Sequence, residues 1–280
     1  MQTLAFCCAL LAILPLAFAC LAGQTSAHQE PLWEFGLGAG VVGFPDYPGA
    51  AVTHAYPVPV PYLRYNGTFL KADRNGVRGL LFNQDWIELN VSGAGTAPVR
   101  DDAVRSGMPN LNPTLEIGPS LDLHLLRSAD GRVKFGFDMP LRAAYALEPS
   151  PRQIGWVFEP RSSFDARDFF GMKGWNLGIL AGPSFADRRY YGYFYGVAPQ
   201  FATLTRPAYE AHGGYGGAGV LAALSKRFPD YWIGAYARLA TLSGAAFEQS
   251  PLVQSRRYWS AGIGFARMIG RSTRRVDVTD

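Results

Sequence analysis

Strict alternation of apolar with small or polar residues runs through long stretches of this chain and limits its possible folds more than any other feature. Residues 114–125 and 133–147 show it most clearly, and residues 33–41, 87–92, 175–185 and 259–269 repeat it. On one face of residues 133–147 every side chain is apolar, whereas the other face carries Lys134, Gly136, Asp138 and Arg142. A period of two is the period of a β-strand with two unlike faces. We therefore predict an all-β fold.

The length of these segments favours a membrane barrel over a soluble sheet. Soluble strands usually have about five or six residues, whereas tilted membrane strands need about 9–11. The polar faces carry glycine and isolated charges, as the lumen of a barrel does. Only 17% of the residues are charged, and 14% are aromatic. A soluble barrel of the lipocalin kind would alternate in the same way and is the alternative interpretation.

The lengths of the connections predict the number and direction of the strands. If the strand from Trp33 runs outward, the connections 43–56, 95–113, 187–213 and 245–257 all lie on the outer side, and short turns such as 128–132 and 228–230 lie on the inner side. Short inner turns and long outer loops are typical of bacterial outer-membrane barrels. We predict an antiparallel transmembrane β-barrel over residues 28–269 with about 12 strands, 10–14 being possible.

The N-terminus has the pattern of a secretory leader. Residues 4–21 are apolar or small, and small and polar residues follow. This pattern predicts a signal peptide over residues 1–27, cleaved after Ala19 or after Ala27. An uncleaved membrane anchor is the alternative, because the apolar run is just long enough to span a bilayer.

All three cysteines, Cys7, Cys8 and Cys20, lie in this leader. Cleavage after Ala27 would leave a mature chain without cysteine, which excludes a disulfide-stapled fold. Cys20 could instead carry a lipid, although the residues before it match a lipobox poorly. At the other end, residues 270–280 are expected to form a basic periplasmic tail.

Motifs that would carry chemistry are weak. Residues 214–219 match GxGxxG, but they open a predicted strand, whereas a dinucleotide site needs a strand before the motif and a helix after it. Close packing in a barrel wall explains the glycines better. None of the four histidines, His28, His54, His124 and His212, has metal-ligand spacing to another, and GxSxG is absent. We expect no enzyme activity, no cofactor and no metal. The formal charge of +4 comes without a basic stripe, so nucleic acid is not an expected partner.

Several ionisable residues fall on the inward faces of neighbouring predicted strands. They are expected to pair inside the barrel, because an unpaired charge in the interior is costly. There they would either tune a pore or fill it. These candidate lumen charges are Glu116, Asp122, His124, Lys134, Asp138 and Arg142.

An ordered set of segments resembles the MipA/OmpV family of outer-membrane proteins. The segments are residues 33–51, 60–65, 107–121, 193–197, 242–253 and 258–265. The resemblance implies a barrel in the Gram-negative cell envelope, in contact with outer-membrane lipid and without catalytic residues. It also implies a scaffold that links a lytic transglycosylase to a murein synthase, a penicillin-binding protein. A narrow channel for small solutes and a surface adhesin are the alternative functions. One departure is that the last predicted strand is followed by the basic tail, whereas such barrels usually end in an aromatic residue.

Overall fold

The computed structural model of the chain describes residues 28–67, 70–73, 76–100, 102–278. The expected leader with its three cysteines therefore lies outside the described residues. The fold is antiparallel β throughout, as predicted. Within the described ranges, no helix is long and apolar enough to cross a membrane. The main strands are β2 Trp33–Pro45, β3 Thr53–Asn66, β4 Leu70–Asp73, β5 Gly76–Gln84, β6 Ile87–Thr96, β7 Thr114–Arg127, β8 Val133–Ala146, β9 Arg152–Phe158, β10 Arg161–Arg167, β11 Trp175–Ala186, β12 Gly214–Arg227, β13 Tyr231–Thr241 and β14 Arg257–Arg271.

Strand pairings run around the sheet and return to their start. Strand β8 pairs with β7 on one side and with both β9 and β10 on the other, and β11 also pairs with both. Strands β9 and β10 therefore share one position, interrupted at Glu159 and Pro160. The first long strand, β2, pairs with the last, β14. The described sheet thus has twelve strand positions, and the prediction of an antiparallel sheet of about 12 strands is confirmed.

Alternation along the strands separates an outward from an inward face, as predicted. In β14 the outward Ile263 is 67% exposed, and in β7 Ile117 is 48% exposed. Inward side chains, such as Glu34 of β2, Asn90 of β6 and Glu116 of β7, are buried. The outward face is therefore apolar and exposed, which is the reverse of a soluble barrel with a greasy interior.

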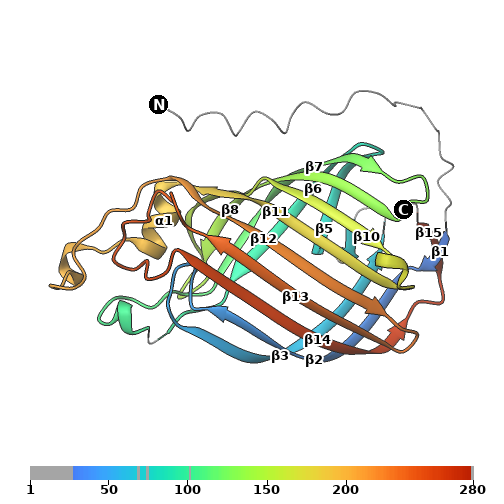
Figure 1. The fold of residues 1–280 in the computed structure, drawn as a ribbon, viewed down its shortest axis with the longest axis horizontal. Helices are drawn as coiled ribbons and strands as arrows, with labels where there is room; N and C mark the ends of the chain where they lie inside the picture. Colours follow the sequence, from blue (N-terminus) through green and yellow to red (C-terminus); the bar gives the residue numbers. More distant parts are fainter. Residues whose placement is uncertain (1–27, 68–69, 74–75, 101, 279–280) are drawn as a thin grey trace, which may run out of the picture.

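The two ends of the barrel differ. The long connections 46–52, 97–113, 187–213 and 242–256 gather at one end, here the loop end, together with the single α-helix of the described chain, α1 Arg188–Tyr195. Short turns and both described termini lie at the other, the turn end (Figure 1). Two predicted boundaries were wrong. The connection placed at 43–56 is shorter, because the β2–β3 ladder continues to the pair Pro45 and Thr53, and the last connection begins already at Leu242.

The buried hydrophobic core lies at the loop end. Side chains from four connections pack together there, and we call this cluster the cap. Tyr195 of α1 stacks on Phe247 with ring centroids 3.7 Å apart and an interplanar angle of 8°. Tyr47 donates a hydrogen bond to the carbonyl oxygen of Leu252 at 2.9 Å. The cap comprises Tyr47, Ala50, Val99, Leu111, Tyr191, Phe194, Tyr195, Ala211, Leu242, Ala245, Phe247 and Leu252.

A small ribbon at the turn end joins the two described termini. Strand β1, His28–Pro31, pairs antiparallel with β15, Arg275–Val278 (Figure 1). The backbone N–H of Leu32 donates to the carbonyl oxygen of Arg274 at 2.9 Å. Glu30 forms an ion pair with Arg64 of β3, which ties the ribbon to the barrel. Sequence reasoning described residues 270–280 only as a basic tail and missed this pairing.

Candidate functional site

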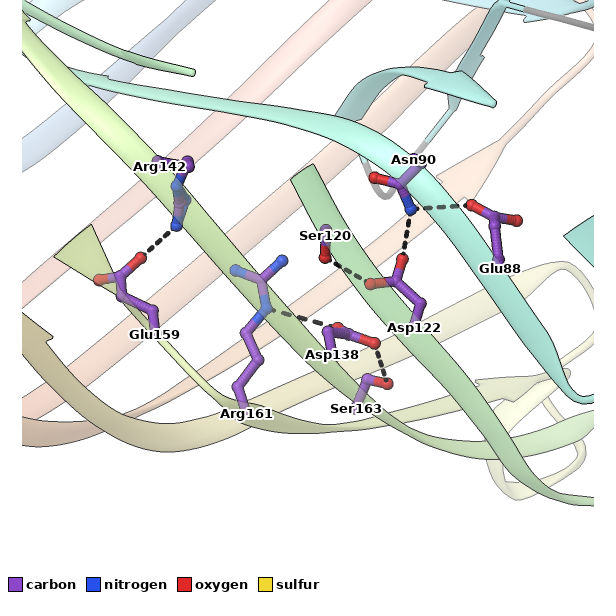
Figure 2. A network of polar contacts seen from close by, with 9 residues as sticks. All are labelled: Glu88, Asn90, Ser120, Asp122, Asp138, Arg142, Glu159, Arg161 and Ser163. Carbon is purple, nitrogen blue, oxygen red and sulfur yellow. Dashed lines mark hydrogen bonds and ion pairs between the residues drawn. The ribbon is translucent and has the colours of Figure 1, made fainter. Parts of the chain in front are cut away.

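One interior wall, formed by β6 to β10, carries a network of polar contacts in neighbouring groups. Asn90 donates through Nδ2 to Glu88 at 3.0 Å and to Asp122 at 2.7 Å. Ser120 donates to the other oxygen of Asp122 at 2.5 Å. Figure 2 shows these side chains pointing toward one another from adjacent strands. The network arises because Glu88, Asp122 and Asp138 lie in register on β6, β7 and β8.

Cations complete this wall on the side of β10. Asp138 accepts from Arg161 Nε at 3.4 Å and from the Ser163 hydroxyl at 3.2 Å (Figure 2). Arg161 lies directly opposite Asp138 in the β8–β10 ladder. The carboxylate therefore has charge-assisted partners, as a buried anion requires.

Arg142 is one of the most enclosed charges of the wall. Its side chain is 3% exposed, with Nε 3.6 Å from Glu116 and Nη2 paired with Glu159. The hydroxyl of Tyr190 in α1 donates to Glu116 at 2.9 Å and so connects the wall to the cap. Burial raises the pKa of Tyr190 well above its usual value, which keeps this phenol a neutral donor. Ionisable groups here thus hold the cap in place.

The remaining candidate lumen charges lie toward the turn end. Lys134 is half-buried and lies opposite Asp165 in the β8–β10 ladder. His124 is exposed near a β-bulge, with Nδ1 3.2 Å from the carbonyl oxygen of Asp85. It shares the inward face of β7 with Asp122, as expected, and lies two residues nearer the turn end, beside the β5–β6 turn.

Opposite the wall of β6 to β10, the inward faces of β2 and β14 are built of small residues where the two strands meet. A Cβ on Gly38 would lie 1.8 Å from the carbonyl oxygen of Phe265, so only glycine fits this position. Gly36, Gly40 and Gly264 continue the inward face of the same strands. Near the turn end this strip of small residues meets aromatic side chains, and the ring centroids of Tyr62 and Trp232 lie 5.9 Å apart. The interior thus has a polar wall at β6 to β10 and a strip of small residues where β2 meets β14.

Two buried arginines tie the longest loops together. Arg206 donates to the carbonyl oxygens of Val104 at 2.7 Å, Ser106 at 2.9 Å and Phe201 at 2.8 Å. Arg105 donates to the carbonyl oxygen of Phe194 at 2.9 Å. Connections 97–113 and 187–213 are therefore held to each other through main-chain acceptors. They form a fixed lid over the loop end.

The GxGxxG motif has a packing role in this structure. It opens β12, as predicted, and a Cβ on Gly216 would lie 1.9 Å from the hydroxyl of Tyr191. Gly217 has a φ of +110°, which other residues rarely adopt. Among the described residues, His, Cys, Asp and Glu form no group that could hold a metal ion.

Comparison with known proteins decides the family. The chain matches the family described as MltA-interacting protein MipA over residues 37–269, most of its length. The chain belongs to this family. No curated protein matches it. Among solved structures it is similar to the outer membrane protein OprD from Pseudomonas aeruginosa, with 6% identity over 92% of this chain and 95% of that one and a TM-score of 0.26.

Several residues of this MipA-family interior were missed from the sequence. Glu159 and Arg161 flank Pro160, which interrupts the alternation, so their inward direction could not be inferred from the pattern. Glu88 and Asn90 did stand on the polar face of a predicted strand, and that signal could have identified them. Tyr190 could not have been found, because its contact with Glu116 joins residues 74 positions apart.

Proposed function

We propose that this chain is an outer-membrane barrel whose loop end faces outward and whose turn end serves as a docking scaffold in the periplasm. The membrane assignment rests on the outward face. Large apolar side chains such as Leu37, Leu239, Trp259 and Ile263 are about half or more exposed around the ring. Exposing so much apolar surface to water would be unusual for a soluble monomer, whereas a bilayer accepts it.

The scaffold role is supported most by the closed loop end. The cap and the arginine-held loops cover that end, and ion pairs cross the interior wall, as in a barrel that serves as a rigid support. The turn end instead presents the β1–β15 ribbon with Arg271, Arg274 and Arg275 exposed. The family description names an interaction with MltA, so a lytic transglycosylase is the first partner proposed, and a penicillin-binding protein the second.

Photo-crosslinking tests the scaffold. A benzophenone amino acid at Gln29, exposed in β1, should crosslink to MltA when the purified proteins are mixed in detergent. The same probe at Ala103, exposed in the loop-end connection, is the matched control and should not crosslink. Crosslinking at Ala103 alone, or at neither position, would contradict a turn-end scaffold.

A narrow channel is the second candidate, and the polar wall of β6 to β10 favours it. In planar bilayers the scaffold proposal predicts no steady conductance for the intact protein. A stable conductance that disappears when the interior wall is changed, as in Asp138→Leu, would support the channel instead.

A further inference from the structure

The barrel wall is incomplete between β3 and β6 in its loop-end half. Among the described residues, strand β4 pairs with β3 only at Tyr65 and Asn66, and β5 pairs with β6 only from Gly79 to Gln84. The β4–β5 hairpin therefore fills the turn-end half of this place in the ring. In the described chain, the rest of β3 and residues 92–96 of β6 have a strand partner on one side only. We call this break the seam; its two strands are labelled at the lower and upper sides of Figure 1.

Three prolines show that the free edge of β3 is built into the sequence. Pro57, Pro59 and Pro61 lie at alternate positions opposite Val41, Ala39 and Leu37 of β2. Residues of an antiparallel pair alternate between hydrogen-bonded and non-hydrogen-bonded positions, and proline has no N–H to donate. These prolines must therefore turn their backbone polar groups away from β2, toward the seam. Proline in a sheet is confined to edges and bulges.

Exposure along the seam agrees with this geometry. Residues 53–57 of β3 and 93–95 of β6 are exposed at every position, so both their faces are open. An unpaired N–H in hydrocarbon costs several kcal/mol. The prolines remove three such donors from the edge, so leaving it unpaired costs less free energy than it would with other residues at these positions.

The surfaces behind the seam differ on its two sides. Inward from β3 lie Val58 and Val60, and Val60 packs against the small wall at Gly40 and Gly264. Across the interior stand the polar groups of β6 and β7, Asn90, Ser92 and Ser120 among them. An apolar chain matches the first surface and a hydrogen-bonding head group the second.

From this arrangement we propose that the seam is a lateral portal for a single-chain amphiphile. The molecule would move between the outer leaflet and the barrel interior, with its tail along Val58, Val60 and the glycines and its head on the polar wall. The cap closes the loop end against a water-soluble solute, whereas the seam opens toward lipid. This inference rests on the membrane location proposed above and is independent of the scaffold role.

Cysteine labelling in lipid vesicles tests the portal. Single cysteines are placed in residues 28–280, which contain none, and the refolded protein is treated with N-dodecylmaleimide, a thiol reagent that is itself a single-chain amphiphile. Val58→Cys probes the seam, and Val42→Cys is the control, since it is also inward and half-buried but lies on a strand paired along both sides. We expect Val58→Cys to react at least about tenfold faster, a ratio that corresponds to about 1.4 kcal/mol.

Each other outcome is decisive. Ile263→Cys, which points outward on β14, reports whether the outer face of the barrel lies in the membrane. If it reacts rapidly while Val58→Cys and Val42→Cys are equally slow, the portal is refuted and the membrane location stands. If Ile263→Cys is itself slow, the proposed membrane location fails. If Val58→Cys reacts with a sulfonated, water-soluble maleimide but not with the dodecyl reagent, the opening admits aqueous solutes, and the lipophile assignment is wrong.

A proline variant tests the free edge separately. Pro57→Thr, Pro59→Thr and Pro61→Thr together restore three donors to β3. An unpaired edge with donors pairs with other chains, so we expect this variant to dimerise or aggregate in detergent. The control changes the residues of β2 that lie opposite these prolines, with Leu37→Thr, Ala39→Thr and Val41→Thr together. Because β2 is paired on both sides, this control should stay monomeric. A monomeric and more stable proline variant would mean that the wall closes there.

Discussion

Removing Arg142 should destabilise the barrel more than any single surface change, because it leaves carboxylates without a cation. The Arg142 side chain is 3% exposed, and that of its partner Glu116 is 7% exposed. Breaking a buried ion pair from one side costs about 3–5 kcal/mol, mostly through the charge left behind. In the Arg142→Met variant, water can reach Glu159, whose side chain is 31% exposed, and Tyr190 still donates to Glu116. We therefore expect the free energy of unfolding to fall by about 3 kcal/mol, the lower end of this range.

The measurement is urea unfolding of the barrel refolded in detergent, followed by tryptophan fluorescence. The matched variant combines Arg142→Met with Glu116→Gln and Glu159→Gln. It removes all three charges and keeps an acceptor for Tyr190, so it should come within about 1 kcal/mol of the parent, since neutral replacements of buried ion pairs are often tolerated. A single variant as stable as the parent, or a triple variant no better than the single one, would refute a network held together by these charges.

Three further predictions concern the outward face and the loop end. Ile263→Arg should destabilise the protein in bilayers by about 2–4 kcal/mol. Ile269 is similarly exposed but lies near Arg271 at the turn end, so Ile269→Arg should cost only about 0–1 kcal/mol. Equal costs would contradict a membrane centred on Ile263. Phe247→Ala should lower the free energy of unfolding of the cap by about 3–5 kcal/mol and speed trypsin cleavage in connection 187–213. The control Leu204→Ala, at a fully exposed position, should leave cleavage unchanged. Unchanged cleavage of the Phe247→Ala variant would show that the cap does not depend on the Tyr195–Phe247 stack. Arg206→Lys should also speed that cleavage, because a lysine cannot reach the Val104, Ser106 and Phe201 carbonyls together, and full protection would argue against this tie.

The strand architecture could be predicted because each strand shows its two faces in its own sequence. Ile117 and Glu116 differ in environment for a reason local to β7, so alternation alone assigned them correctly. Strands β9 and β10 share one position in the sheet, and Pro160 between them hid the inward direction of its neighbours. Boundaries were less accurate, since the extension of β2 to Pro45 depends on pairing with β3.

The cap, the terminal ribbon and the seam could not be predicted, because all three depend on contacts between distant segments. Tyr195 meets Phe247 across 52 positions of the chain, and β1 meets β15 from the opposite terminus. The alternation of apolar and polar residues within a strand carries no information about such distant contacts. The alternating prolines of β3 are an exception, since they stood in the sequence as a sign of a free edge.

Labelling of whole cells tests the central claim most directly, namely that the barrel spans the outer membrane with its loop end outside. Ala103→Cys lies exposed in the connection after β6, and Ala129→Cys lies exposed in the short turn after β7. With a membrane-impermeant maleimide, Ala103→Cys should react in intact cells, and Ala129→Cys only after the cells are opened, with the unmodified chain as the control for Cys7, Cys8 and Cys20. The reverse pattern, or equal labelling of both positions in intact cells, would contradict the account.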